Sequence, residues 1–167
     1  MANLNTFVQK LAGGGARANQ YEVSITGGPF ATTDLFTFLC RAATIPSQTI
    51  GEVPVPFRGR QIYVAGERTF EPWTVTVFSD AGWQLRGQLE QWSNLIMNMG
   101  SDSTGATSPD QYYGEAIVRQ MDRNESTINE YTLFQLWPTT VDPIALAYDT
   151  NDIVEEFGVT WRYNYMT

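Results

Sequence analysis

Alternating apolar and polar residues predict that most of this chain is β-strand. From Tyr21 to Thr26 the two kinds of side chain exchange at every residue, which is the period of a strand with one buried face. Further strands are expected at 35–45, 73–78, 115–121, 127–137, 144–148 and 153–166. Two strands have a distinct apolar face, namely Phe36, Phe38, Cys40 and Ala42 in the second, and Phe157, Val159, Trp161, Tyr163 and Tyr165 in the last.

One helix is predicted between residues 80 and 100. Its apolar positions advance by steps of 4, 3, 4 and 3, the spacing of a single helical stripe: Leu85, Leu89, Trp92, Ile96 and Met99. Ser79 or Asp80 can cap its start, and Gly100 stands where a glycine often ends a helix. Many strands with one helix indicate a mainly β fold, a barrel or sandwich with a flanking α-helix.

Residues 1–18 are predicted to form an N-terminal arm, and residues 19–167 a single β domain. In the arm, Leu4, Phe7, Val8 and Leu11 are spaced like one face of a short helix, and the glycines at 13–15 form a joint. A docking arm and a frayed terminus are equally consistent with this pattern. Residues 100–114 form a Ser/Thr/Gly-rich loop that is long for a compact domain.

Residues 47–70 are predicted to form a long amphipathic β-hairpin that turns at Gly59. Its first strand has Val53, Val55 and Phe57 on one face and Glu52, Pro54, Pro56 and Arg58 on the other. Its second strand has Arg60, Ile62 and Val64 opposite Gln61, Tyr63 and Ala65. Because the two prolines cannot donate to a ladder, the first strand belongs at an edge. Such an edge either pairs with another chain or folds back on its own domain.

Composition removes several classes of function. The chain has 167 residues, 10 basic and 18 acidic, so its net charge is −8, and it has no histidine and one cysteine, Cys40. Catalytic triads with histidine, histidine metal sites and internal disulfides are therefore excluded. The acidic balance argues against a protein that grips nucleic acid by its phosphates. No apolar run is long enough for a membrane helix, and the N-terminus lacks a signal-peptide pattern.

The remaining side chains indicate no enzyme, metal or cofactor. Carboxylates are plentiful, but no spacing singles out a catalytic pair. Cys40 is expected to be a small buried apolar residue. The many Trp and Tyr residues would suit a carbohydrate-binding β-sandwich, although they fall at core-facing strand positions.

A family resemblance gives these features a common meaning. The run from Arg60 to Val77, RQIYVAGERTFEPWTVTV, resembles the signature of the tail tube proteins of contractile-tailed, T4-like bacteriophages. Shorter matches follow the same order: Phe36-Thr37-Phe38 with Cys40, 116–120, 136–139 with Val141, and Phe157-x-Val159-Thr160. The resemblance covers nearly all of the chain from about residue 19.

The resemblance implies a virion protein with the phage tail-tube fold. Six copies would form a ring, and rings would stack into a tube inside the sheath, with hairpins joined around the lumen. The implied partners are further copies of the chain, the tail sheath, tape-measure, baseplate and tail-terminator proteins, and double-stranded DNA in transit. Assembly would take place in the host cytoplasm. The tube of a tailocin or a type VI-like machine is a close alternative.

Within this framework the hairpin supplies the candidate site residues. We expect the more polar face to meet the lumen and the apolar face to pack on the subunit body. The candidate lumen residues are Glu52, Arg58, Gln61 and Tyr63. The candidate interface residues are Val53, Val55, Phe57, Ile62, Val64, Glu67 and Arg68, the last two for contacts along the tube with the arm or loop 100–114. An acidic lumen would repel phosphates and let DNA slide, unless the charge serves only solubility.

Overall fold

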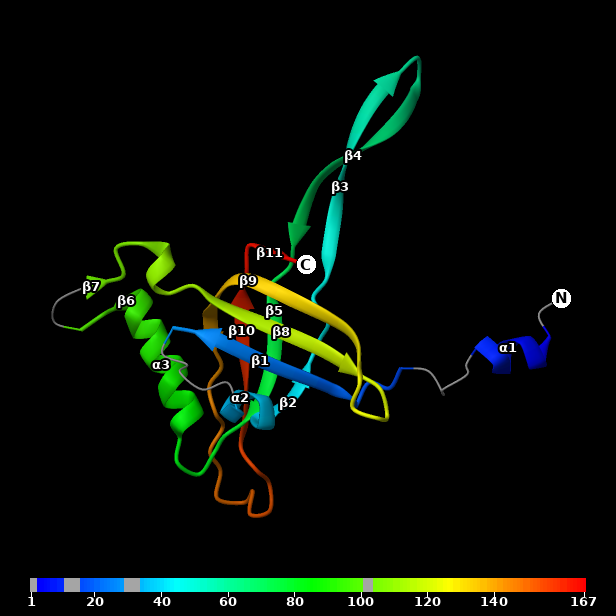
Figure 1. Ribbon diagram of the computed structural model, residues 1–167. Helices are drawn as coiled ribbons and strands as arrows, with labels where there is room; N and C mark the ends of the chain where they lie inside the picture. The colour runs from blue at the N-terminus through cyan, green and yellow to red at the C-terminus, as the bar shows by residue number, and fades with distance from the viewer. Residues whose placement is uncertain (1–2, 11–15, 29–33, 101–103) are drawn as a thin grey trace.

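The computed structural model describes residues 3–10, 16–28, 34–100 and 104–167. Figure 1 shows a β-rich body, one long helix against it and a hairpin that extends well beyond it. In chain order the elements are α1 (Leu4–Lys10), β1 (Tyr21–Gly27), α2 (Asp34–Leu39), β2 (Cys40–Ala43), β3 (Gln48–Phe57), β4 (Arg60–Phe70), β5 (Trp73–Phe78), α3 (Gln84–Ile96), β6 (Met97–Asn98), β7 (Thr104–Gly105), the 3₁₀ turn η1 (Pro109–Gln111), β8 (Gly114–Met121), β9 (Thr127–Val141), β10 (Glu156–Arg162) and β11 (Tyr165–Met166).

The long strand β9 connects two antiparallel layers of the body. Its first part pairs with β8 and β11, and its last residues pair with β10, giving the strand order β1-β8-β9-β10-β5-β2. Gln135 in β9 has a φ of 56°, so the strand bends where it passes from one layer to the other. In Figure 1 the strands β1 and β8 cross β5 and β10 at a steep angle. The predicted mainly β fold is therefore confirmed.

The core lies between these layers and is closed on one side by α3. Apolar residues that alternate along each strand point inward, as the period predicts: Val23, Ile25, Ala116 and Val118 from one layer, and Trp73, Val75, Val77, Phe157, Val159 and Trp161 from the other. Leu85, Leu89 and Trp92 of α3 complete it, and all three are 0% exposed. The predicted helix stripe is confirmed over these positions.

The end of α3 differs from the prediction. The helix stops at Ile96, and Met97 has an extended backbone that begins β6. Met99 is 78% exposed, so it does not belong to the buried stripe, and Gly100 is not the residue that ends the helix. Pairing of Met97 and Asn98 with β7 gives a local reason, because this ladder needs extended residues where the stripe would continue. The predicted loop 100–114 thus contains β7 and η1 in its described part.

Three predicted strands differ from the structure, two in part and one entirely. Residues 35–45 begin as the helix α2 and become a strand only at Cys40. Phe36 is fully buried while Phe38 is 84% exposed, since positions two apart lie on opposite sides of a helix. Residues 144–148 form no strand, and the last strand begins at Glu156 rather than 153. Tyr165 is 45% exposed and lies outside the core face of Phe157 to Tyr163.

The N-terminal arm is described only in part. The predicted helix is present as α1, and Leu4, Phe7 and Val8 are 59–73% exposed. Leu11 and the glycines at 13–15 lie outside the described residues. The apolar face of α1 therefore remains uncovered within the described part of the chain.

Candidate subunit interface

The hairpin β3–β4 forms a two-stranded sheet of its own and rises from the body in Figure 1. Its predicted boundaries are confirmed, since β3 and β4 span Gln48–Phe57 and Arg60–Phe70. Each strand pairs only with the other, so both outer edges are unpaired within the described residues. Unpaired edges present backbone groups to which another chain can add a strand.

A tight turn determines how the hairpin is paired. Arg58 and Gly59 have φ values of 45° and 80°, and positive values at both central residues define a type I′ turn. The flanking pair, Phe57 with Arg60, is then a hydrogen-bonded pair, and bonded and non-bonded pairs alternate from there. Arg58 lies in the turn and on neither face, which corrects the prediction that it shares a face with Glu52. Its guanidinium instead lies over the Phe57 ring, 5.5 Å from the centroid.

The pairing gives the two prolines a defined consequence. Pro54 pairs with Tyr63 and Pro56 pairs with Gln61, and both are non-hydrogen-bonded pairs. The prolines therefore remove no hydrogen bond between β3 and β4. The missing N–H groups fall on the outer edge of β3, where the edge keeps carbonyl acceptors but lacks two donors. The outer edge of β4 keeps its donors at Gln61 and Tyr63. The hairpin therefore has two chemically different edges.

Apart from Arg58, the predicted faces are confirmed by the pairing of their residues across the strands. Val53 pairs with Val64 and Val55 with Ile62, so these four apolar side chains share one face. On the other face Tyr63 donates a 3.2 Å hydrogen bond from its hydroxyl to Oε1 of Gln61. Glu52 lies on this second face, opposite Ala65.

The apolar face is not covered by the chain's own body. The residues that form it are between 44% and 57% exposed: Val53, Val55, Phe57, Ile62 and Val64. The expectation that this face packs on the body of its own subunit is therefore wrong. The hairpin projects away from the body in Figure 1, and nothing in the described part of the chain covers this face. An isolated two-stranded hairpin is only marginally stable in water, so this hairpin gains little from its own pairing. An exposed apolar face of this kind indicates a contact with another molecule.

A bulge divides the hairpin into a distal and a proximal part. Gly66 and Glu67 together oppose Gly51, because the pairing shifts between Ile50 and Glu52. A Cβ on Gly66 would lie 3.1 Å from the carbonyl oxygen of Gly51, so the two backbones approach closely there. Glu67 lies in the bulge and Arg68 follows it, and both are exposed, without an ion pair among the described residues.

Tyr163 holds the base of the hairpin to the body. Its ring centroid lies 5.6 Å from that of Phe70 at the end of β4, and its hydroxyl donates to the carbonyl of Ser47, just before β3. Tyr163 is 2% exposed, and burial raises the pKa of its hydroxyl, which keeps it a donor. Both ends of the hairpin thus meet one side chain of the core.

Two kinds of site are absent from the described part of the molecule, namely metal clusters and membrane-spanning helices. Over residues 3–10, 16–28, 34–100 and 104–167, no three metal-ligating side chains lie close enough to hold an ion. In the same ranges no helix has the length and apolar character needed to cross a membrane. Cys40 is half-buried at the start of β2, and burial raises the pKa of its thiol to about 12.

Comparisons with known proteins agree with this geometry. A sequence model of the family described as phage tail tube protein matches residues 13–167. Tail tube protein gp19 of Enterobacteria phage T4 is 36% identical over 151 residues, 90% of each chain. The tail tube protein of Serratia phage KSP90 is 28% identical and covers 98% of this chain and 95% of its own.

A solved structure of similar fold belongs to a contractile machine. In the sheath–tube complex of the extracellular contractile injection system PVC, in its extended state, a chain matches with a TM-score of 0.62 at 12% identity, over 100% of this chain and 99% of that one. At this identity the likeness concerns the fold alone. The family match and the identity to the T4 protein show that this chain belongs to the phage tail tube proteins.

Proposed function

We propose that this protein is the structural subunit of the inner tube of a contractile tail, in which hexameric rings stack into a hollow cylinder. One observation carries the proposal: the hairpin β3–β4 has two unpaired edges and an apolar face that its own chain leaves 44–57% exposed. Burial of that face between subunits would supply the hydrophobic driving force for assembly. Membership of the tail tube family supports the same conclusion.

Contact around the ring is assigned to the edges and the apolar face of the hairpin. Val53, Val55, Ile62 and Val64 pack against a neighbouring subunit, while backbone groups on the outer edges add to its sheet. Because the β3 edge lacks donors at Pro54 and Pro56, it pairs best with a surface that offers donors. Unequal edges favour a head-to-tail arrangement of identical subunits, and such an arrangement closes into a ring when its rotation allows.

The lumen is assigned to the polar face of the hairpin, with Glu52, Gln61 and Tyr63. An acidic wall keeps DNA mobile because it repels phosphates. The hairpin does not supply this charge, because its three arginines (Arg58, Arg60 and Arg68) outnumber its two glutamates (Glu52 and Glu67) and leave it a net charge of +1. Most of the negative charge of the wall must therefore come from the body. A tube structure with a predominantly basic lumen would contradict this assignment.

The role is structural and not enzymatic, and the partners are those of a tail. Besides its own copies they are the sheath, tape-measure, baseplate and tail-terminator proteins, with DNA as transient cargo and assembly in the host cytoplasm. The fold likeness to the PVC sheath–tube complex keeps a second candidate open, the tube of a phage-derived injection machine without DNA. Carbohydrate binding is disfavoured, because Trp73, Trp92 and Trp161 are at most 1% exposed.

Electron microscopy of the purified protein tests the proposal. Negative-stain images over a concentration series are expected to show rings, hollow tubes or both. A strict monomer at every concentration, even with sheath or baseplate proteins added, would contradict the tube function. DNA packaged in the particles released from producing cells would indicate the phage tube, and particles without DNA would indicate the injection-machine tube.

A further inference from the structure

Another exposed apolar surface, besides those of the hairpin and α1, lies at the opposite end of the molecule from the hairpin tip. The segment 142–155, here called the acidic loop, joins β9 to β10 and hangs below the body in Figure 1, where the hairpin points upward. Four of its apolar side chains are 60–105% exposed: Leu146, Tyr148, Ile153 and Val154. Exposed aliphatic and aromatic side chains gathered on one loop indicate a contact surface.

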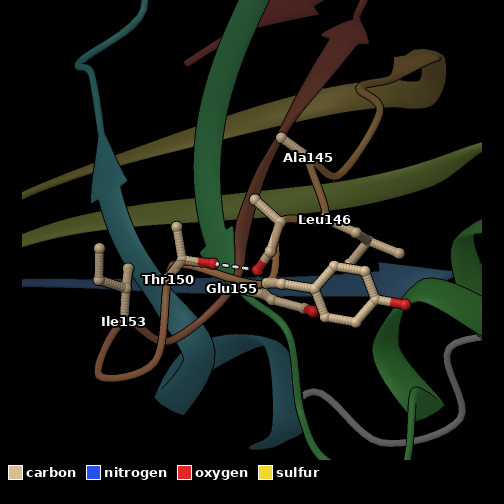
Figure 2. Close-up of a pocket in the computed structure, with 7 residues that line it drawn as sticks. Ala145, Leu146, Thr150, Ile153 and Glu155 are labelled. Atoms are coloured by element: carbon tan, nitrogen blue, oxygen red, sulfur yellow. Dashed lines mark hydrogen bonds between the residues drawn. The ribbon is translucent and has the colours of Figure 1, made fainter.

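The acidic loop lines an open hollow that can receive a side chain. Figure 2 shows the hollow, with Leu146 and Ile153 among the apolar residues on its wall and Glu155 beside them. Its volume is about 420 Å³, and a neighbouring hollow of about 590 Å³ shares Ala145, Thr150, Ile153 and Glu155. The hydroxyl of Thr150 donates a 2.9 Å hydrogen bond to the carbonyl of Ala147, which holds the loop closed on itself.

The charge of this loop is entirely negative. Asp142, Asp149, Asp152 and Glu155 lie within it and no lysine or arginine does. None of these four carboxylates takes part in an ion pair among the described residues. The neighbouring hollow also has Arg41 in its wall, but this arginine is paired with Glu156. An apolar group with positive charge beside it therefore complements the loop.

The hairpin tip has that combination. Phe57 is 57% exposed, and Arg58 and Arg60 follow it around the type I′ turn. Neither arginine has a carboxylate partner in the described part of the chain. The Arg58 guanidinium lies over the Phe57 ring, so the tip presents an aromatic ring and cations as one unit.

We propose that the hairpin tip of one copy docks into the acidic loop of a copy in the next ring. Phe57 enters the hollow, and Arg58 and Arg60 meet the carboxylates of Asp149, Asp152 and Glu155. The tip and the loop lie at opposite ends of the molecule, so the tip cannot reach the loop of its own chain. Contact between successive copies therefore leaves a free tip at one end and a free loop at the other, and it repeats along an axis as an open stack. The inference rests on the proposed tube function and assigns its axial contact, leaving the sides of the hairpin to the ring.

Charge reversal tests the pairing. The tip variant carries Arg58→Glu and Arg60→Glu, and the loop variant carries Asp149→Arg and Asp152→Arg. Arg123→Glu, in the exposed turn between β8 and β9, is the matched control. Each variant is checked for native circular dichroism and then imaged by negative stain, with the concentration needed for tubes measured by sedimentation.

Both reversed variants are expected to stop at rings or to need at least about tenfold more protein for tubes, because like charges then meet at every stacking contact. The Arg123 control should match the wild type. Mixing the two reversed variants should restore tubes, since each then offers the complementary surface to the other. Reversed variants that stack like the wild type, or a mixture that restores nothing, would overturn the inference.

Two further results keep this test separate from that of the proposed function. A wild type that forms no tubes contradicts the tube function itself, whereas wild-type tubes with unaffected variants contradict only the docking. Tubes from the wild type that show another surface against the acidic loop, such as α1, would also overturn it.

Discussion

The indole of Trp92 lies so close to Gly114 that no other residue fits at that position without movement. A Cβ on Gly114 would lie 2.6 Å from the Cη2 atom of Trp92 and 2.7 Å from the carbonyl oxygen of Thr26. The Trp92 Nε1 donates a 2.7 Å hydrogen bond to the carbonyl of Tyr112, which fixes the ring in place. This contact fastens α3 to the start of β8.

Gly114→Ala should therefore destabilise the monomer. Overpacking of a well-filled core costs about 1–3 kcal/mol, and neither the indole nor the backbone of β1 can retreat freely. Urea unfolding followed by tryptophan fluorescence measures the loss. Gly87→Ala is the matched control, because nothing lies within 4 Å of its added Cβ and alanine favours α3 by about 0.5–1 kcal/mol. Equal stability of the Gly114 variant and the wild type would contradict the packing.

Asp80, rather than Ser79, should supply the side chain that caps α3, since Trp83 at the N-cap position makes no side-chain hydrogen bond to the helix. The Asp80 carboxylate accepts hydrogen bonds from the backbone N–H groups of Gln84 and Leu85, at 3.0 and 3.1 Å. The Ser79 hydroxyl is buried and has no partner among the described residues. Asp80→Ala is expected to cost about 1 kcal/mol in urea unfolding at pH 7, and Ser79→Ala close to nothing. A larger loss at Ser79 would reverse the assignment.

The same cap gives a pH dependence. Burial raises the pKa of Asp80, but the backbone N–H groups that bind its carboxylate outweigh this, and the pKa lies below the usual 3.8. The unfolded chain therefore takes up this proton first as the pH falls. The stability contributed by Asp80 is complete above pH 3.8 and is lost as the pH falls through the lower folded value. The difference between wild type and Asp80→Ala in urea unfolding should shrink in that range.

Val64→Asp should block assembly while leaving the monomer folded. Val64 is 53% exposed and pairs with Val53 on the apolar face, so the change adds no charge to the core. A carboxylate in a subunit contact, in contrast, must be desolvated. Sedimentation is expected to show a monomer with wild-type circular dichroism. Val64→Thr, which keeps the shape and strand preference, should still assemble, and unimpaired tubes of the aspartate variant would exclude this face from the contact.

Cys40 should react slowly with thiol reagents. Burial raises the pKa of its thiol to about 12, so very little thiolate is present at pH 8. An absorbance assay with a disulfide reagent should show modification far slower than for a free thiol, becoming fast when urea unfolds the chain. Rapid labelling of the native protein at pH 8 would contradict the burial of the sulfur.

Local patterns were enough to predict the strands that bury one face. In β1 and β5 every second side chain enters the core, and the alternation Trp73, Val75 and Val77 records this burial directly. The stripe of α3 and the hairpin at 47–70 were predictable for the same reason. An apolar pattern with a period of two residues, or of 3.6 residues, arises whenever one side of a strand or helix is buried, and it can be read from the local sequence.

In two segments the alternation of apolar and polar residues predicts a strand that the tertiary structure does not form. Residues 35–39 have the period of a strand, yet form α2, in which Phe36 enters the core while Phe38 is left outside. Ile153 and Val154 look like the start of a strand, but β10 begins at Glu156, where it finds β5 as a partner. An isolated pattern cannot report whether a partner strand is within reach.

For the candidate interface, the sequence alone determined the two faces of the hairpin and the edge character of its proline strand. Only the tertiary structure decided that the body covers neither face. Coverage depends on the direction in which the hairpin leaves the body, and the contacts of Tyr163 with Ser47 and Phe70 fix the base of the hairpin there. The tertiary structure likewise decided that an acidic apolar loop lies at the far end from an arginine-rich tip. Distances between segments 90 residues apart come from the packing of the layers, and no local pattern contains them.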